Sequence, residues 1–179
     1  GIGNTTAASA ITSALTGQPV ENVTGRGAGL DETGRNRKLD VIRKSLRLHF
    51  PGQTTPADPM EILRCVGGLE IAAMTGFILG AAHHGEAILC DGFISTAAAA
   101  LAYAIAPNVK AYLFAGHNSQ EPGHQHLLGY LDLRPILNLE MRLGEGTGAV
   151  LAMPIVEAAL RLYSEMATFA SAGVSEAEA

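Results

Sequence analysis

The chain has 179 residues, of which 47% are hydrophobic and 16% charged, and this is enough for one domain with a substantial core. The net charge of −5 argues against a nucleic-acid partner, and no apolar run reaches the length of a membrane span. The 2 cysteines form no CxxC pair and no basic-then-apolar leader opens the chain, so we expect a reduced, cytoplasmic setting.

The first half of the chain is expected to be helical, with glycine-rich loops between the helices. Apolar residues recur at helical spacing in stretches bounded by glycine, proline or capping residues. Asn4 or Thr5 can cap the first helix, and Asp31 can cap the second, which runs to about His49. These signals predict helices within 4–16, 31–49, 59–66 and 69–84.

The second half alternates short apolar runs with helices, which predicts an α/β fold with a parallel sheet. The runs expected to be buried strands lie within 87–90, 110–116 and 135–139. Ligands of such sheets bind at the carboxyl ends of the strands. The polar residues that follow the first two predicted strands are Asp91, His117, Asn118 and Ser119.

Helices connect these strands, and a last helix follows the third strand. The connecting helices are expected within 93–106 and 121–133. The last helix runs to about Phe169 and begins either near Thr147 or at Pro154, since a proline is favoured in the first turn of a helix. Residues 1–170 are therefore assigned to one α/β unit, and 171–179 to a polar, mobile tail.

Three glycine-rich loops are candidate phosphate sites, because glycines let backbone N–H groups approach an anion and a helix N-terminus favours negative charge. The loops are Gly1-Ile-Gly3-Asn4-Thr5-Thr6, Gly25-Arg26-Gly27-Ala-Gly29 and Gly144-Glu145-Gly146-Thr-Gly148. None has the spacing of a Walker loop, so each taken singly is explained by a plain turn. Arg26 and Lys38 add positive charge near the first two loops, although Lys38 also fits a solvated helix position.

Glu145 is the candidate for a chemical role as a base. It stands between Gly144 and Gly146, which allow a substrate to lie against the carboxylate, just ahead of an apolar run. Apolar surroundings raise the pKa of a carboxyl group and tune it as a general base near neutral pH. The alternative is a carboxylate that interacts with the N-terminus of the following helix, which weakens if that helix begins at Pro154.

The other polar clusters have structural alternatives. Asp91 can bind a hydroxyl or orient a base, but it can equally cap the helix that follows it. His117, His124 and His126 invite a metal site, yet an HxH pair on a helix points to different faces and no acidic or thiol ligand lies at a recognised spacing. We therefore expect no metal site.

Five motifs occur in order along nearly the whole chain: GIGNTTAASAITSALTG, GRGAGLD with the following RK, DGFISTAAA, GHNSQEPGH and LGEGTGA. Together they resemble the nicotinate-nucleotide:dimethylbenzimidazole phosphoribosyltransferases of cobalamin biosynthesis. The resemblance implies transfer of phosphoribose from nicotinate mononucleotide to 5,6-dimethylbenzimidazole, giving α-ribazole 5′-phosphate and nicotinate. It also implies a cytoplasmic homodimer with a Rossmann-like parallel sheet that needs no metal or other cofactor.

The resemblance also assigns roles to residues of this chain. Glu145 matches the family's general base, which takes the imidazole N–H proton as the other ring nitrogen attacks C1′ of the ribose. The residues that match the 5′-phosphate site are Gly1, Gly3, Asn4, Thr5, Thr6, Gly27 and Lys38. The residues expected to line the substrate cleft are Asp91, His117, Ser119, Gly144 and Gly146.

One departure from the family bears on activity. Family members carry an upstream half, with a Glu-Met pair ahead of the GIGNTT motif and most of the benzimidazole pocket, so we expect this chain to be a portion truncated at its N-terminus. An inactive or partner-dependent fragment that binds a nucleotide phosphate is therefore an alternative function. A third, from another class, is a metal-dependent hydrolase that uses the histidines.

Overall fold

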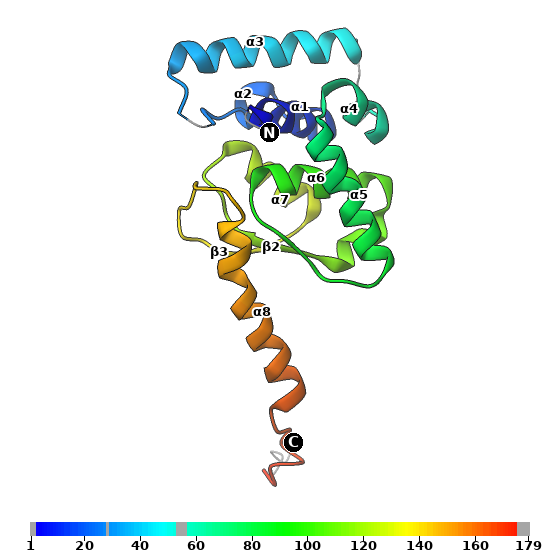
Figure 1. The fold of residues 1–179 in the computed structure, drawn as a ribbon, viewed down its shortest axis with the longest axis vertical. Helices are drawn as coiled ribbons and strands as arrows, with labels where there is room; N and C mark the ends of the chain where they lie inside the picture. The colour runs from blue at the N-terminus through cyan, green and yellow to red at the C-terminus, as the bar shows by residue number, and fades with distance from the viewer. Residues whose placement is uncertain (1–2, 28, 53–56, 175–179) are drawn as a thin grey trace, which may run out of the picture.

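The computed structural model describes residues 3–27, 29–52 and 57–174, so that Gly1 and residues 175–179 of the predicted tail lie outside it (Figure 1). The helices are α1 (Asn4–Thr16), α2 (Val20–Val23), α3 (Glu32–His49), α4 (Pro59–Val66), α5 (Leu69–His83), α6 (Phe93–Ile105), α7 (Pro122–Leu131) and α8 (Thr147–Glu165). The strands are β1 (Ile88–Cys90), β2 (Leu113–His117) and β3 (Pro135–Leu137), and a 3-10 helix, η1 (Pro107–Tyr112), leads into β2.

The three strands form one parallel sheet in the order β1-β2-β3, which confirms the predicted α/β fold. Ala115 in the central strand lies opposite Cys90 of β1 and Pro135 of β3. Because the strands run the same way, their carboxyl ends meet along one edge of the sheet. Asp91 directly follows β1 and His117 ends β2, so both predicted residues stand at this edge.

The core is built around α6, an alanine-rich helix that packs against α1, α5 and α7. Every residue from Ala97 to Ala102 is fully buried. Small side chains let neighbouring helices approach closely, which is how a chain with only 5% aromatic residues fills its interior.

The start of α1, the start of β2 and the presence of α2 differ from the sequence prediction. Gly3 is the N-cap of α1, so neither Asn4 nor Thr5 caps this helix. β2 begins only at Leu113, because the segment that starts at Pro107 winds into η1 instead of extending the strand. α2 lies outside the predicted elements, since four residues are too few to show a helical period.

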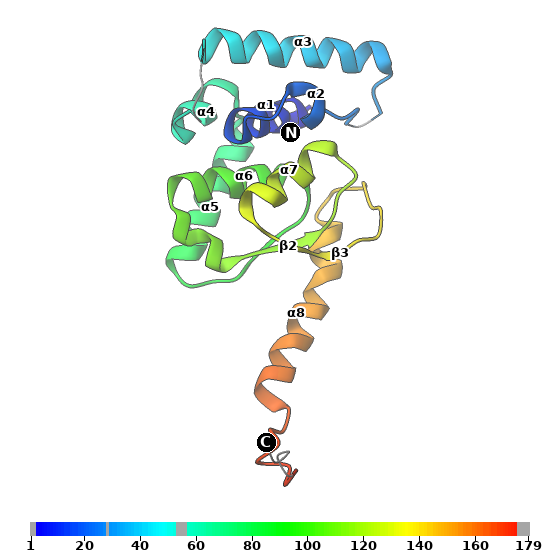
Figure 2. The ribbon, with the colours of Figure 1, turned by 180° about the vertical axis from the view of Figure 1, so that it is seen from behind.

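α8 begins at Thr147 and continues through Pro154, which decides between the two predicted starts, and it ends at Glu165, before the predicted end near Phe169. The first turns rest on the sheet, and the remainder projects away from the body (Figures 1 and 2). None of the helices in the described ranges combines the length and the apolar composition needed to cross a membrane.

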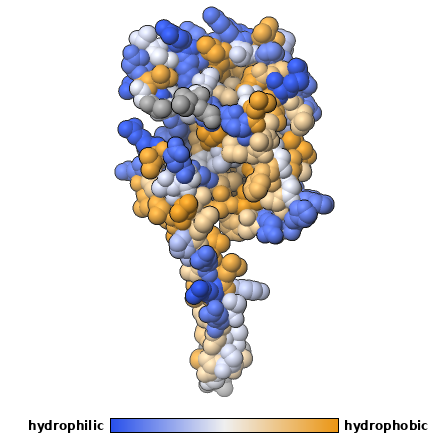
Figure 3. All heavy atoms as spheres, in the orientation of Figure 1, coloured by the Kyte–Doolittle hydropathy of each residue, from blue (hydrophilic) through white to orange (hydrophobic). Residues whose placement is uncertain are grey.

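Most apolar side chains of α8 are exposed. Gly148 and Ala152 are the buried residues of this helix, whereas Tyr163 is 93% exposed. The other exposed apolar side chains of the helix include Val150, Leu151, Met153, Ile155, Leu160 and Leu162. The projecting helix therefore carries hydrophobic residues beside its hydrophilic ones (Figure 3). Phe114 in the central strand is also 41% exposed, although both faces of a parallel sheet are normally covered.

Candidate functional site

A buried lysine meets the N-terminal turn of α1. Lys38 on α3 is only 6% exposed, and its Nζ donates to Oγ1 of Thr5 at 2.9 Å and to the carbonyl of Gly25 at 3.3 Å. The alternative of a solvated helix position is therefore wrong for this residue. Burial lowers the pKa of Lys38, and the negative charge of Glu121 partly opposes that effect.

The start of α1 and the loop before α3 complete this cluster. Gly3 has φ 89°, and among the described residues no side chain caps the helix that it precedes, so the amides ahead of Thr6 at the start of α1 have no capping side chain there. Gly27 has φ 57°, and a Cβ there would lie 2.9 Å from Oγ1 of Thr5 and 3.7 Å from Nζ of Lys38. The structure thus brings together the described residues of the predicted phosphate site, because Thr6 lies in the same turn, its N–H bonded to the Gly3 carbonyl.

Arg26, the other cation considered for an anion site, is directed elsewhere. Its guanidinium forms an exposed ion pair with Glu32 at 3.1 Å, at the start of α3. Glu32 also lies 3.7 Å from Arg35 in the next turn. Lys38 is therefore the basic side chain that the fold buries against the start of α1.

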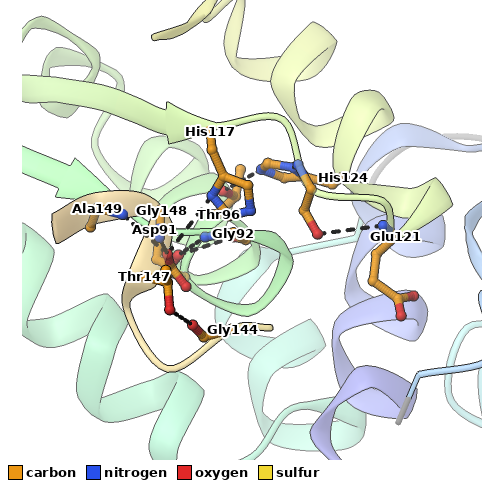
Figure 4. Close-up of polar contacts among 12 residues, drawn as sticks. Asp91, Gly92, Thr96, His117, Glu121, His124, Gly144, Thr147, Gly148 and Ala149 are labelled. Carbon is orange, nitrogen blue, oxygen red and sulfur yellow. Dashed lines mark hydrogen bonds and ion pairs between the residues drawn. The ribbon is translucent and has the colours of Figure 1, made fainter. Parts of the chain in front are cut away.

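Asp91 caps a helix, but not the one that follows it. Its Oδ1 accepts hydrogen bonds from the backbone N–H groups of Gly148 at 2.7 Å and Ala149 at 3.1 Å, in the first turn of α8 (Figure 4). At the start of α6, the N–H of Gly92 instead donates to Oγ of Ser95 at 3.1 Å. The alternative that Asp91 caps α6 is therefore wrong, and its carboxylate joins the end of β1 to the start of α8.

His117 fills the space between the end of β1 and the start of α8. The residue is 3% exposed, and its Nδ1 lies 3.8 Å from Oδ1 of Asp91. A Cβ at Gly148 would overlap Nδ1 of this ring, and one at Gly92 would lie 3.1 Å from its Cε1. The absence of a Cβ at these two glycines therefore makes room for the imidazole, which packs beside Gly92 and Gly148 (Figure 4).

His124 is held in the core by bonds to both ring nitrogens. The N–H of Ser119 donates to Nδ1 at 3.0 Å, so Nε2 carries the proton and lies 2.9 Å from Oγ1 of Thr96. Burial lowers the pKa of His124 to about 4, with His117 adding to the effect and Asp91 opposing it. This ring is engaged as a core histidine, which argues against the histidine-based hydrolase.

Two further observations concern metal and thiol chemistry. Within residues 3–27, 29–52 and 57–174, no three His, Cys, Asp or Glu side chains lie together as a metal site would require. Cys90 stands beside Asp91, but burial raises the pKa of its thiol to about 12, so it is protonated at neutral pH.

Glu145 stands at the tip of a loop of unusual backbone conformation. Gly144, Glu145 and Gly146 all have positive φ, at 77°, 58° and 77°. The N–H and Oγ1 of Thr147 close the loop by donating to the carbonyl of Gly144 at 3.0 Å and 2.7 Å. The side chain of Glu145 is exposed among the described residues, so the apolar surroundings expected from the sequence are not formed around it. Because α8 begins at Thr147, the alternative interaction with a helix N-terminus keeps its geometric basis.

Two of the predicted glycine loops lie on the same side of the molecule. The loop before α8 and the glycine loop before α3 both lie toward the left in Figure 1 and toward the right in Figure 2.

A separate hollow of about 650 Å³ lies between α4 and α5, lined in part by Met60, Leu63 and Leu69, and it contains none of the predicted residues.

The hydrogen bonds from α8 to Asp91 are the feature of the candidate site that the sequence did not predict. These bonds join Asp91 to residues that lie 57 and 58 positions further along the chain, and no local sequence pattern indicates a contact over such a separation. The available signal was Gly148, the third glycine of the GEGTG loop, because a glycine in a helix costs stability relative to alanine and so indicates a packing constraint.

The matches to known proteins extend over nearly the whole chain and agree on one family. A family model described as "Phosphoribosyltransferase" matches residues 1–174. The nicotinate-nucleotide–dimethylbenzimidazole phosphoribosyltransferase of Desulforudis audaxviator is 56% identical over 178 residues, covering 99% of this chain and 50% of that protein. The protein of the same name from Chloroflexus aurantiacus is 53% identical, over 98% of this chain and 49% of its own. The crystal structure of CobT from Thermus thermophilus superposes with a TM-score of 0.91 at 50% identity, covering 99% of this chain and 52% of that chain.

Proposed function

The chain belongs to the phosphoribosyltransferase family, and from that premise we propose that it carries a phosphoribosyl-transfer site. The proposed reaction moves phosphoribose from nicotinate mononucleotide to 5,6-dimethylbenzimidazole, giving α-ribazole 5′-phosphate and nicotinate for the lower ligand of cobalamin. The names of the curated relatives support these substrates. The chain spans about half the length of those relatives, so the substrates, the activity and the homodimer expected from the sequence are proposals for this chain.

The observation that carries the proposal is the buried Lys38 beside the start of α1. A fixed ammonium, free amides of a helix N-terminus and a close-packed glycine are what a phosphate group needs from a protein. Lys38, Thr5 and Gly27 supply these features within hydrogen-bonding or van der Waals reach of one another. We assign the 5′-phosphate of nicotinate mononucleotide to this cluster, which would anchor the substrate far from its reacting carbon.

Glu145 is the proposed general base. Its carboxylate would take the N–H proton of the imidazole ring while the other ring nitrogen forms a bond to C1′. The bond from C1′ to nicotinate breaks at the same centre, its electron pair returns to the pyridine nitrogen, and the configuration at C1′ inverts. An exposed carboxylate in a glycine-flanked loop is accessible to the imidazole N–H of the substrate, and it accepts the proton without acquiring positive charge.

A partner-dependent fragment is the second candidate, and one observation favours it. The apolar surroundings that would tune Glu145 are not formed by the described residues, so another polypeptide segment would have to supply them. In that case the chain would bind nicotinate mononucleotide without turning it over.

Calorimetry with nicotinate mononucleotide tests the phosphate assignment. We expect Lys38→Met to weaken binding by about tenfold or more, because a charge-assisted contact to phosphate is lost. Lys44→Met is the matched control, since Lys44 is an exposed lysine of the same helix. Equal affinity of Lys38→Met and the parent would contradict the assignment, and an assay of α-ribazole phosphate separates turnover from binding alone.

A further inference from the structure

We propose that Asp91 is a positioning residue that holds Glu145 in place through the first turn of α8. The inference rests on the proposed function, because it assigns to Asp91 a role in placing the base. In this role Asp91 touches neither the substrate nor the reacting atoms. Its carboxylate acts on the backbone that carries Glu145.

The first link between Asp91 and Glu145 is the hydrogen-bonded cap that Asp91 provides for α8. α8 starts from Gly146, which has no side chain, so in the part of the chain that the structure describes the N-cap residue supplies no capping bond. The N–H groups of Gly148 and Ala149 are the second and third amides of the helix, the ones that a capping side chain normally satisfies. Oδ1 of Asp91 accepts from both of them, at 2.7 Å and 3.1 Å, so the cap is supplied from the end of a strand.

The second link is the close contact between α8 and β2. A Cβ at Gly116 would lie 3.0 Å from the carbonyl oxygen of Gly148 and 3.1 Å from the Cα of Ala149. His117 packs against Gly148 from the same strand. The helix start thus rests backbone against backbone on the central strand, and Asp91, which is 20% exposed, fixes it there. A site built on strands is held more precisely than one built on a loop alone.

The third link is the loop itself. Thr147, the first residue of α8, closes the loop by two hydrogen bonds to the carbonyl of Gly144. Glu145 lies inside this closed turn, in a left-handed conformation that the two flanking bonds maintain. A displacement of the helix start is therefore passed to Glu145, and a misplacement of about 1 Å can cost about 100-fold in rate.

A general contribution to folding is the competing explanation, and the chain offers a matched control for it. Asp58 caps α4 in the same way, because its Oδ1 accepts from the N–H groups of Met60 at 2.9 Å and Glu61 at 3.1 Å. α4 carries none of the predicted site residues. Removal of the Asp58 cap therefore measures how much folding stability is lost with a two-amide cap when Glu145 is not displaced.

Amide hydrogen exchange followed by NMR tests the first link without any assay of activity. In Asp91→Ala we expect the amides of Gly148 and Ala149 to exchange about tenfold faster or more, while a buried amide of α6 such as that of Leu101 keeps its rate. Asp91→Asn retains an acceptor oxygen, so it should keep exchange within about threefold of the parent. Unchanged exchange of both amides in Asp91→Ala overturns the proposal.

Steady-state transfer from nicotinate mononucleotide tests the link to Glu145, using the chain with the half of the Desulforudis audaxviator relative that it does not match. In Asp91→Ala we expect kcat to fall about 100-fold with little change in KM for nicotinate mononucleotide, and in Asp91→Asn we expect partial rescue. Asp58→Ala should keep the kcat of the parent. The double variant Asp91→Ala/Glu145→Gln should be no slower than Glu145→Gln alone, since a residue that acts through Glu145 has nothing further to lose.

The outcomes separate this inference from the proposed function. A Glu145→Gln variant as active as the parent, or a parent without turnover, counts against the proposed function, and the exchange experiment still decides whether Asp91 holds the helix start. A slow Glu145→Gln beside a fully active Asp91→Ala overturns the positioning role alone. Equal losses of kcat in Asp91→Ala and Asp58→Ala overturn it as well, because they would indicate a general effect on folding.

Discussion

At the scale of single residues, Glu145 adopts a backbone conformation that favours glycine. Its φ of 58° places it in the left-handed region, which costs a non-glycine residue roughly 1–2 kcal/mol. Glu145→Gly should therefore raise the free energy of unfolding by about 1 kcal/mol and abolish transfer, because strain is retained where function needs the side chain. Urea unfolding and the transfer assay measure the two effects.

Glu140 provides the control for this prediction. It too is an exposed glutamate with positive φ, at 53°, and it lies outside the proposed site. Glu140→Gly should gain similar stability without losing activity. The account of Glu145 would be wrong if Glu145→Gly were destabilised or retained full turnover.

We expect His124 to make the stability of the chain depend on pH. The folded histidine stays neutral down to about pH 4, because burial lowers its pKa, whereas the unfolded one binds a proton below about 6.5. Between these values the unfolded state holds more protons, so the free energy of unfolding falls as the pH is lowered from 6.5 to 4. The loss attributable to His124 is on the order of 3 kcal/mol.

Equilibrium urea unfolding at pH 6.5 and pH 4 measures this difference. His124→Gln should be less stable at the higher pH but should lose much of the pH dependence, since glutamine does not titrate. His126→Gln, two residues away and only half-buried, should keep the dependence of the parent. The same dependence in all three proteins would show that another group is responsible.

At the scale of elements, the contact between α8 and β2 depends on glycine. A Cβ at Gly148 would overlap the ring of His117, so Gly148→Ala should destabilise the chain by about 1–3 kcal/mol through overpacking. Gly129 in α7 is the matched control, because a Cβ there meets nothing within 4 Å. Gly129→Ala should be neutral or gain roughly 0.5–1 kcal/mol in thermal or urea unfolding, and a stable Gly148→Ala would contradict the packing.

Sequence patterns predicted most of the elements because their signals are local. The parallel strands around Cys90 and Ala115 follow from apolar runs bounded by turns, and the cap of α3 by Asp31 follows from its place before the helix. Errors arose where a local pattern has two solutions. The predicted strand begins at residue 110, but residues 110–112 belong to η1, and Gly3 rather than Asn4 or Thr5 is the N-cap of α1.

At the scale of the whole molecule, the parts of the site could be named from the sequence but not assembled. The burial of Lys38 depends on contacts with Thr5, 33 positions away, and helical periodicity cannot report them. The cap that Asp91 supplies to α8 crosses 57 positions. The family resemblance pointed to Lys38, Thr5 and Asp91. The contacts that connect Asp91 to the loop of Glu145 could be seen only in the folded structure.

The exposed apolar surface of α8 leads to a prediction about assembly. We expect the chain to bind the half of the Desulforudis audaxviator relative that it does not match, because burial of that surface would stabilise the complex. Light scattering after size-exclusion chromatography should detect the complex. Leu160→Lys should weaken it, whereas Leu48→Lys, at a comparably exposed leucine of α3, should not, and absence of any complex would contradict the expectation.

The role of Glu145 as the base of a phosphoribosyl transfer is tested by the rate of product formation. α-Ribazole 5′-phosphate formation is followed for the parent, Glu145→Gln and Glu140→Gln, each with the unmatched half of the Desulforudis audaxviator relative present. If Glu145 is the base, Glu145→Gln lowers kcat by about 100-fold to 10,000-fold while Glu140→Gln remains as fast as the parent. Turnover by Glu145→Gln at the rate of an active parent would contradict it.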